Sequence, residues 1–167
     1  NFLYKTTPYN VICPNATDAW TFGFEVDSAT QYYTEVNYTL SRTTNSGETW
    51  ESITFPHTEP GYFSCLSASS GDVAWSSYVD YSEGNKLLQT VDGGLTWTQL
   101  PVYLGVWINL AHLFDENKGV TMGDPDSLGF EIHTTLDGGA SWTRVDNNNI
   151  PAALPDEYAF AGSYEVV

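Results

Sequence analysis

The sequence predicts an all-β protein made of β-propeller blades, and three observations support this prediction. One eight-residue frame, Thr-x-Asp/Asn-x-Gly-x-Thr/Ser-Trp, occurs three times. Its tryptophans, Trp50, Trp97 and Trp142, are 47 and 45 residues apart, a period that is typical of propeller blades and solenoids. No segment shows convincing helical periodicity, whereas short alternating runs of the kind found in half-buried strands precede each frame.

Each copy of the frame predicts a tight hairpin turn. The copies read TTNSGETW (43–50), TVDGGLTW (90–97) and TLDGGASW (135–142). Aspartate or asparagine can bond to the backbone amides of the turn, and glycine accepts the positive φ that the turn requires. Tryptophan is large enough to fill space between neighbouring sheets. We therefore expect structural roles for the frame residues, which are Thr43, Asn45, Gly47, Trp50, Thr90, Asp92, Gly94, Trp97, Thr135, Asp137, Gly139 and Trp142.

The residues upstream of each frame predict three further strands. Leu40, Leu87 and Ile132 stand three residues before the threonines, as a strand with one buried face requires. Further upstream, CPNATDAWTFG, CLSASSGDVAWSSY and HLFDENKGVTMGD each read as a strand, a polar turn and a second strand. Four short strands per repeat fit a four-stranded antiparallel blade. A parallel β-helix would have shorter coils, and a sandwich would not need the same octet three times.

The repeat boundaries predict about three full blades and two partial ones. Residues 10–57, 58–104 and 105–154 are expected to form the full blades. Residues 1–9 would supply the last strand of a preceding blade, and residues 155–167 the first strand of a further blade. Closed propellers typically have four to eight blades, and exposed sheet edges invite pairing. The chain is therefore expected to be a piece of a longer propeller, to close with another copy of itself, or to polymerise through its edges.

The three frames resemble the Asp-box, or BNR repeat, found in propellers of sialidases, sortilin-type receptors and some glycoside hydrolases. The whole unit, in which an Ala-Trp pair precedes the box, is most similar to Ycf48-like and other secreted bacterial Asp-box proteins. The segment 123–145 resembles a blade of secreted Bacteroidetes-type proteins of this kind. The resemblance covers roughly residues 11–145. It implies that each box lies on the hairpin between the third and fourth strands of its blade, away from an active face.

The charge of the chain argues against several functions. Twenty-one acidic residues against 5 basic residues give a formal net charge of -16. Nucleic-acid binding needs a basic footprint, and an anionic membrane surface would repel this chain. No apolar run approaches the roughly 18 residues of a membrane-spanning helix. The resemblance implies that a sialidase would use three arginines for its substrate carboxylate, but the chain has only Arg42 and Arg144.

Acidic residues supply many pairs for glycoside hydrolysis, which needs two carboxyl groups about 5 to 10 Å apart. No pair stands out. Acidic residues are expected in predicted turns for local reasons, and this applies to the pairs Asp124 with Asp126, Asp115 with Glu116, and Asp80 with Glu83. We therefore expect no catalytic residues, and a glycoside hydrolase with its active site partly outside this chain is the alternative.

The sequence offers candidate metal ligands but no recognisable metal site. The segment GDPDS at 123–127 and the run 146–149 offer oxygen ligands suited to calcium, but neither matches an established calcium loop. The histidines, His57, His112 and His133, have no close-spaced ligand partner. We therefore expect no metal site and no cofactor, with Ca2+ as the one ion that the turns would suit.

Aromatic residues at segment ends are the predicted binding residues. They are Tyr32, Tyr33, Tyr78, Tyr81, Tyr103 and Trp107. Propeller ligands commonly meet loops at one face, where aromatic side chains stack on sugars or anchor a partner protein. The alternative is that these side chains fill the gaps between blades.

Two further patterns bear on location. Cys13 and Cys65 stand at similar places in adjacent repeats, which leaves open a disulfide or two buried free thiols. Asn15 and Asn37 match the N-glycosylation acceptor pattern. The sequence therefore predicts a secreted or cell-surface, acidic glycoprotein that acts as a non-catalytic binding or structural module. Its partner would be a protein, a glycan or another copy of itself.

Overall fold

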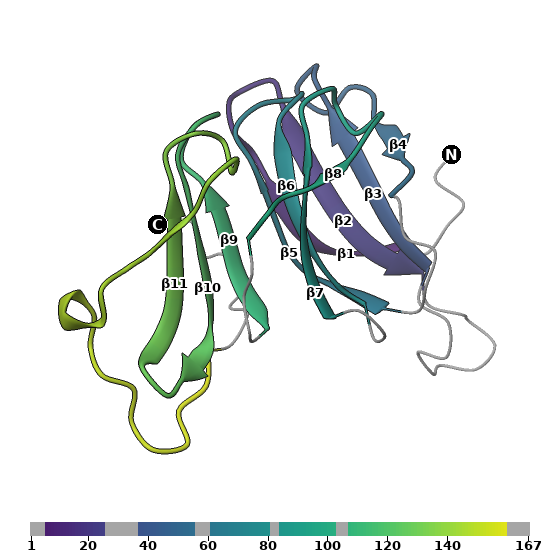
Figure 1. Cartoon of the computed structure of the whole chain (residues 1–167). Coiled ribbons are helices and arrows are strands. Elements are labelled where there is room, and N and C mark those ends of the chain that lie inside the picture. The colour runs from purple at the N-terminus through teal and green to yellow at the C-terminus, as the bar shows by residue number, and fades with distance from the viewer. Residues whose placement is uncertain (1–5, 26–36, 56–60, 81–83, 103–106, 160–167) are drawn as a thin grey trace.

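The chain folds into three four-stranded antiparallel sheets that lie side by side (Figure 1). The computed structural model describes residues 6–25, 37–55, 61–80, 84–102 and 107–159. In these ranges the only helical element is η1, a single 3-10 turn at Asn147–Asn149, and no helix has the length and apolar character needed to cross a membrane. The predicted all-β class and the predicted four-stranded propeller blades are confirmed.

Every sheet is an up-and-down meander whose strands follow the chain order. The first sheet contains β1 (Thr6–Ile12), β2 (Ala19–Glu25), β3 (Asn37–Thr43) and β4 (Glu51–Ile53). The second contains β5 (Gly61–Ala68), β6 (Ala74–Asp80), β7 (Gly84–Thr90) and β8 (Thr98–Gln99). The third contains β9 (Ile108–Leu113), β10 (Gly119–Asp126), β11 (Gly129–Thr135) and β12 (Thr143–Arg144).

The boxes all lie at one end of the molecule, which we call the box end. Each box connects the third and fourth strands of its sheet, as predicted. The turn between the first and second strands lies at the same end, because that strand pair is antiparallel. We call these second elements the companion turns, and they span 13–18, 69–73 and 114–118. The second and third strands are connected at the opposite end, the connection end.

The hydrogen-bond registers make the three sheets equivalent residue by residue. Ala19 pairs with Thr43, Ala74 with Thr90, and Gly119 with Thr135, so these pairs mark the same place in each sheet. One residue further along the second strand, Trp20, Trp75 and Val120 are equivalent. Differences between the sheets can therefore be assigned to single substitutions at matched positions.

Two hydrophobic clusters join the sheets, and we call them the first interface and the second interface. The first interface, between the first and second sheets, buries Trp20, Phe22, Leu40, Phe55, Phe63, Leu66, Tyr78 and Leu88. The second interface, between the second and third sheets, buries Cys65, Val73, Trp75, Leu87, Leu100, Ile108, Ala111 and Leu113. Burying one large apolar side chain contributes about 1.5–3 kcal/mol. Inter-sheet packing is therefore a main source of stability in this fold.

The expected N-terminal blade boundary is wrong. Strand β1 begins at Thr6 and pairs with β2 through Ile12, so the boundary between residues 9 and 10 falls inside one strand of the first sheet. At the other end, residues 155–159 form a turn and irregular chain rather than a strand, and 160–167 lie outside the described residues. The expected boundaries at 57/58 and 104/105 also lie outside the described residues.

The cysteines are two free thiols, so neither predicted alternative is correct. Cys65 is buried, but Cys13 is exposed. The register explains the difference, because Cys65 pairs with Ser77 in the place where Asn10 pairs with Phe22 in the first sheet. Cys13 instead follows β1, beyond its last paired residue. The expectation that the two cysteines stand at similar places in adjacent repeats is therefore wrong.

Candidate functional site

The second and third boxes are closed by the same set of hydrogen bonds. Thr90 Oγ1 donates to Asp92 Oδ1 over 2.8 Å and accepts from the Gly94 amide over 2.8 Å. The amide and hydroxyl of Thr96 donate to the two oxygens of Asp92 over 2.9 and 2.6 Å. These bonds, with the Thr96 hydroxyl first, lower the pKa of Asp92 to about 2. The carboxylate is therefore ionised and fully engaged in its own turn at neutral pH.

The third box has the same chemistry, and the first box keeps the geometry without the charge. Hydrogen bonds led by that of the Ser141 hydroxyl lower the pKa of Asp137 to about 2. In the first box, Asn45 Oδ1 accepts from Thr43 Oγ1 over 2.9 Å, and Asn45 Nδ2 donates to Thr49 Oγ1 over 2.8 Å. The boxes therefore fix the turns, and their polar side chains are satisfied internally.

Each box is also bonded to the companion turn of its own sheet. The amides of Ser46, Gly93 and Gly138 donate to the carbonyls of Thr17, Asp72 and Asn117 over 2.8, 2.9 and 2.8 Å. The companion turns are themselves capped by side chains that accept from backbone amides, namely those of Asn15, Ser70 and Asp115. Sequence reasoning missed these caps. The signal for them is an Asn, Asp or Ser whose side chain can accept a hydrogen bond from the backbone amide two residues later.

Arg42 fills the space between the first and second sheets at the box end. Its Nη1 donates to the Gly71 carbonyl over 2.7 Å and lies 3.2 Å from Asp72 Oδ1. Its Nε lies 3.1 Å from a carboxylate oxygen of Glu51, and its guanidinium carbon lies 5.9 Å from the centre of the Trp20 ring. A Cβ added to Gly93 would lie only 1.6 Å from Arg42 Nη1. The guanidinium therefore occupies this part of the first interface.

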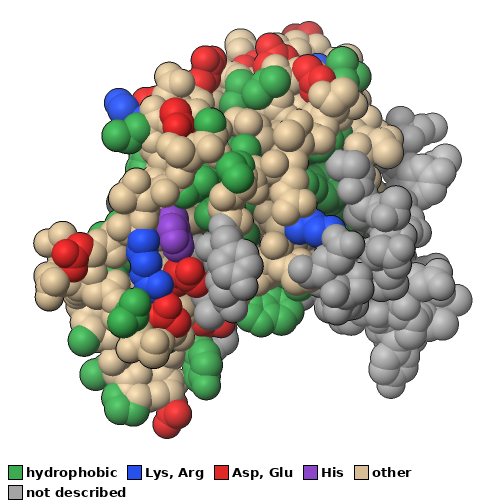
Figure 2. Space-filling view, viewed as in Figure 1, with side chains coloured by type: hydrophobic (Ala, Val, Ile, Leu, Met, Phe, Trp, Pro, Cys, Tyr) green, Lys and Arg blue, Asp and Glu red, His purple; other side chains and the backbone are tan. Residues whose placement is uncertain are grey.

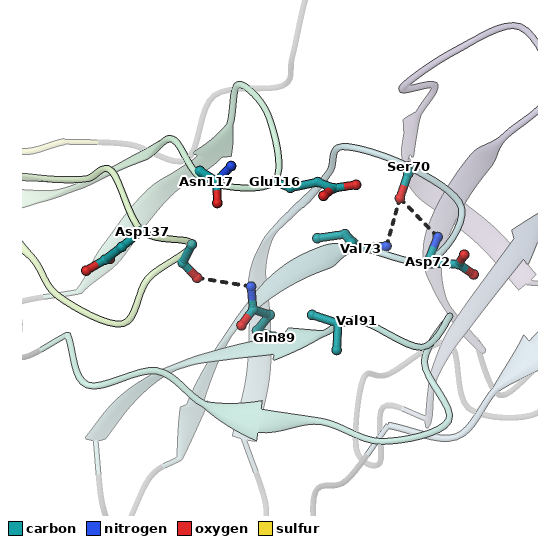
Figure 3. Close-up of a pocket in the computed structure, with 9 residues that line it drawn as sticks. Ser70, Asp72, Val73, Gln89, Val91, Glu116, Asn117 and Asp137 are labelled. Carbon is teal, nitrogen blue, oxygen red and sulfur yellow. Dashed lines mark hydrogen bonds between the residues drawn. The ribbon is translucent and has the colours of Figure 1, made fainter.

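Gln89 replaces Arg42 at the second interface, and here a groove is open. Gln89 follows the same register, since it pairs with Trp75 as Arg42 pairs with Trp20. Its shorter, neutral side chain donates to the Gly138 carbonyl over 3.1 Å. A cavity of about 500 Å³ lies beside it, which we call the open groove. Figure 3 shows its lining, which is Ser70, Asp72, Val73, Gln89, Val91, Glu116, Asn117, Asp137 and Gly138.

The open groove is acidic and partly apolar. Glu116 extends from the third sheet toward the turn that carries Ser70 and Asp72 (Figure 3). Asp72 is shared with Arg42, and the oxygens of Asp137 are bonded within its own box, so Glu116 is the carboxylate most available to a ligand. Val91 contributes an exposed apolar side chain. Figure 2 shows acidic and apolar side chains together along the box end of the molecule.

A second cavity, of about 340 Å³, lies where the three first strands end. Strand β5 contacts both β1 and β9, so this cavity is near the line on which the sheets converge. Its wall includes Cys13, His112 and Phe114. Burial lowers the pKa of His112, so the imidazole is largely neutral at pH 7. The polar side chains in this wall are fewer than in the open groove, and we regard the open groove as the better candidate site.

The predicted aromatic binding residues are not brought together by the described structure. Tyr78 is buried, with its ring centre 5.7 Å from that of Phe63 and 6.0 Å from that of Phe55, so its predicted binding role is wrong. The alternative, that such residues fill the space between blades, holds for Tyr78. Trp107 is 42% exposed and precedes β9 at the connection end. The other four, Tyr32, Tyr33, Tyr81 and Tyr103, lie outside the described residues.

Three of the carboxylates considered for catalysis or calcium are bonded to other groups of the protein. Asp126 forms a two-point ion pair with Arg144 at 2.7 and 2.9 Å, and the Arg144 guanidinium lowers the pKa of Asp126 to about 2. Asp124 Oδ1 accepts from Asn109 and from the Ala159 amide, each over 3.0 Å. Asp146 caps η1. In the part of the chain that the structure describes, no three His, Cys, Asp or Glu side chains gather as a metal site.

The two glycosylation patterns differ in setting. Asn15 is exposed in the first companion turn, where Nδ2 donates to Asp18 over 2.8 Å and Oδ1 accepts from the Thr17 and Asp18 amides. A glycan on Asn15 would have to share the nitrogen that makes the Asp18 contact. Asn37 begins β3 and pairs with Glu25 at the connection end.

Comparison with known proteins supports the architecture. A scan against protein-family models and a search of curated protein sequences gave no match. The chain is similar to a solved structure of Ycf48 bound to a D1 peptide, with a TM-score of 0.60 and 21% identity, over 85% of this chain and 41% of that chain. The fold is that of a Ycf48-like β-propeller. Ycf48 from Cyanidioschyzon merolae matches with a TM-score of 0.56 and 20% identity, over 86% of this chain and 38% of that chain.

The similarity is one of fold and covers part of a propeller. The chain spans about two fifths of the length of the Ycf48 structures. A GH74 xyloglucanase from Xanthomonas campestris is more distant, with a TM-score of 0.49 and 14% identity, over 80% of this chain and 21% of that chain. The Ycf48-like resemblance drawn from the boxes is thus confirmed as a fold.

Proposed function

We propose that the chain is a non-catalytic β-propeller module that binds a segment of a partner protein, with a cationic side chain of that segment in the open groove. The observation that carries this proposal is the exchange of Arg42 for Gln89 at equivalent positions. At the first interface, the chain's own guanidinium fills the space between the two turns. At the second interface, the corresponding space is open and bordered by acidic side chains.

The contacts of Arg42 indicate what a partner's guanidinium would meet. Arg42 bonds to the carbonyl of Gly71 and the carboxylate of Asp72 in the companion turn of the second sheet. The corresponding residues of the third sheet are Glu116 and Asn117, and both line the open groove. Guanidinium groups form strong charge-assisted hydrogen bonds with carboxylates and carbonyls. The net charge of -16 would also speed the approach of a basic segment.

A known propeller of this fold gives independent support for the class of partner. One of the similar Ycf48 structures is described as bound to a D1 peptide. A Ycf48-like fold therefore suits the holding of a peptide segment. The acidic groove specifies a basic segment for the present chain, with an apolar neighbour beside the charged residue to contact Val91, which is 64% exposed.

The proposal is tested by fluorescence anisotropy with three labelled twelve-residue peptides, one containing an Arg-Leu pair in a basic sequence, one acidic and one neutral. We expect binding of the basic peptide alone, weakening as salt is raised because exposed charges are screened over about 10 Å at 0.1 M. Gln89→Arg should abolish binding, because the introduced guanidinium would fill the groove as Arg42 fills the first interface. Equal binding of the basic and neutral peptides would contradict the proposal.

Two matched variants separate the groove from the overall charge. Glu116→Gln removes the available carboxylate and should weaken binding about three- to tenfold, the effect of losing one exposed charge-assisted hydrogen bond. Glu48→Gln makes the same change at an exposed position in the first box, outside the groove, and should have little effect. Equal effects of the two variants would show that only the net charge matters.

We also propose that the chain acts outside the cell or on its surface. The two N-glycosylation patterns and the strongly acidic composition support this. Expression through a eukaryotic secretory pathway, followed by endoglycosidase treatment, tests whether the asparagines can carry glycans. The expected result is a mass decrease that Asn37→Gln removes and Asn15→Gln leaves, because the side-chain amide of Asn15 is held in a turn by Asp18.

A further inference from the structure

Both interfaces use one repeated docking contact, in which an aliphatic side chain of one sheet sits against the second glycine of the next box. A Cβ added to Gly94 would lie 2.5 Å from Ile53 Cγ2, and a Cβ added to Gly139 would lie 2.7 Å from Leu100 Cδ1. Ile53 and Leu100 are equivalent, since each lies opposite the strand residue three positions before its box. The second box glycine is therefore a socket for the preceding sheet.

The box tryptophan completes this contact. Trp97 lies with its ring centre 5.1 Å from that of Phe55, and Trp142 lies 5.3 Å from Trp75. In both cases the tryptophan packs against the sheet that comes earlier in the chain. Every sheet thus has a socket face, with the box glycine and tryptophan, and a knob face, with the aliphatic residue. The first interface and the second interface each join a knob face to a socket face.

Among the described residues, no further sheet lies beyond the outer face of either end sheet (Figure 1). On the socket face of the first sheet, only Trp50 of the described residues lies within 4 Å of a Cβ placed on Gly47. Val11 on this face is 51% exposed, whereas its register equivalents, Leu66 and Ala111, are 0% exposed. Among the described residues, therefore, none fills the socket of the first sheet, whereas the sockets of the second and third sheets are filled by Ile53 and Leu100.

The third sheet presents the complementary knob face. Val145 is the equivalent of Ile53 and Leu100, since its amide donates to the Ile132 carbonyl as that of Leu100 donates to Leu87. Val120, Met122 and Ile132 lie on the same face and are half-buried. The equivalent residues of the first sheet, Trp20, Phe22 and Leu40, are buried under the second sheet. This apolar face is of the kind that a further socket face covers.

We propose that a second copy of this chain supplies that socket face, so that Val145 of one copy packs against Gly47 of the other. The contact continues the two interfaces already present in the chain. The expected assembly is a symmetric pair in which two identical knob-to-socket contacts join the copies. This assembly is separate from peptide binding, since the open groove lies within one copy.

Net charge sets the conditions for this association. Each copy carries a formal charge of -16, so the two copies repel one another at low ionic strength. Apolar packing at the two contacts does not depend on salt in this way, and salt screens the repulsion. Association should therefore strengthen as salt rises, which is the opposite of the salt dependence expected for the basic peptide.

Sedimentation equilibrium of the full chain in 0.15 M and 1 M NaCl tests the proposal. We expect a species of twice the 18.5 kDa chain mass, more abundant at 1 M. Ile132→Lys on the knob face and Val11→Lys on the socket face should each weaken pairing at least roughly a hundredfold, because an unpaired ammonium would be buried. Leu128→Lys is the matched control, since Leu128 is 66% exposed at the turn between β10 and β11.

Mixing the two variants gives the decisive result. The Val11→Lys copy keeps an intact knob face and the Ile132→Lys copy keeps an intact socket face, so a 1:1 mixture should recover one contact and form a heterodimer. Each lysine substitution makes the net charge of the chain less negative and so reduces the repulsion between two copies. A loss of pairing by either variant therefore cannot come from stronger charge repulsion. A wild-type chain that stays monomeric in both salts, or a dimer that survives both variants, would overturn the proposal. Far-UV circular dichroism verifies that each variant is folded, and exposed Val11 makes its variant the safer of the two.

Discussion

The two inter-sheet interfaces have the same register but are completed in different ways. At the first interface, the Trp20 indole donates to the Ser70 carbonyl over 2.8 Å, and Asp18 accepts from the Gly71 amide over 2.8 Å. At the second, the equivalent Trp75 is fully buried and its indole nitrogen has no hydrogen-bond partner among the described residues. The main polar contacts there are Gln89 with Gly138 and the Leu113 amide with Ser67 Oγ.

This difference shows how one blade design can be used for two purposes. Where a sheet supplies Trp, Asp and Arg at matched positions, the polar groups of the box end are paired across the interface. Where Arg42 is replaced by Gln89, the apolar packing continues but a groove opens above it. Packing and ligand access are therefore set by different residues. The following predictions test this separation, from the largest expected effect to the smallest.

Alanine at the socket glycines should give the largest loss of stability. Gly94→Ala and Gly139→Ala place a Cβ against Ile53 or Leu100 and also strain a positive φ, for a total of about 2–4 kcal/mol. Gly47→Ala has the same kind of φ but meets no other sheet in the described structure, so about 1 kcal/mol is expected. Urea unfolding measures all three. A loss at Gly47 as large as at Gly94 would show that backbone strain, rather than docking, sets the cost.

Phenylalanine at the two buried tryptophans should distinguish the interfaces. Both changes remove packing volume, at a cost of about 2 kcal/mol each. Trp20→Phe also leaves the Ser70 carbonyl without its indole partner, which adds about 1–2 kcal/mol. Trp75→Phe loses no such bond. We therefore expect the first variant to unfold at lower urea than the second, and the reverse order would refute the proposed difference in polar pairing.

Exchanging Arg42 should have a smaller effect on stability. Its carboxylate partners, Glu51 and Asp72, are 67% and 73% exposed, so each ion pair contributes little. The bond to the Gly71 carbonyl is the stronger contact, and Arg42→Gln should cost about 1 kcal/mol. Gln89→Arg should leave the melting temperature nearly unchanged while blocking peptide binding. Melting temperature and peptide anisotropy are measured on the same samples of both variants. A variant that loses peptide binding without a change in melting temperature would show that groove access and interface stability are independent.

Acid should affect the boxes unequally. The pKa of Asp92 and Asp137 is about 2 in the folded state, below the unfolded value of about 3.9. The stability that their ionised carboxylates give to the fold is therefore fully present above pH 4 and is lost as the pH falls through 2. Asn45 in the first box does not titrate. The double variant Asp92→Asn, Asp137→Asn should therefore lose less stability than the wild type between pH 4 and pH 2. Urea unfolding of both proteins at several pH values measures this difference. If the free energy of unfolding changes with pH equally in the wild type and the double variant, the box aspartates do not cause the acid sensitivity.

The sequence was a good guide to whatever depends on local turn chemistry. Three boxes were enough to predict three sheets, because each box fixes a hairpin within its own few residues. The position of β1 was missed because Thr6–Pro8 pair with β2, a strand of the first full blade, although the repeat boundaries assign residues 1–9 to a preceding blade. The cysteines were misaligned because Cys13 lies six residues before Ala19 whereas Cys65 lies nine residues before Ala74, and counting back from these two alanines would have revealed the difference.

The candidate groove could not be predicted, because it depends on which side of a strand faces which neighbour. Arg42 and Gln89 are both unremarkable strand residues in the sequence, and only the inter-sheet geometry shows that they fill, or fail to fill, the same space. Tyr78 illustrates the opposite error. It stands near the end of a strand, where an exposed ring is expected, but Phe55 and Phe63 cover it from other segments of the chain.

The hydrogen bonds between each box and its companion turn have a practical consequence for protein engineering. A peptide inserted into a box would disrupt both turns of that sheet at once, since Gly93 is bonded to Asp72 and Gly138 to Asn117. The hairpin at Ser127–Leu128, at the opposite end, is exposed and independent of these bonds. This hairpin is the place to graft a recognition loop, so the molecule could display a new sequence at one end while its box end keeps the scaffold in shape.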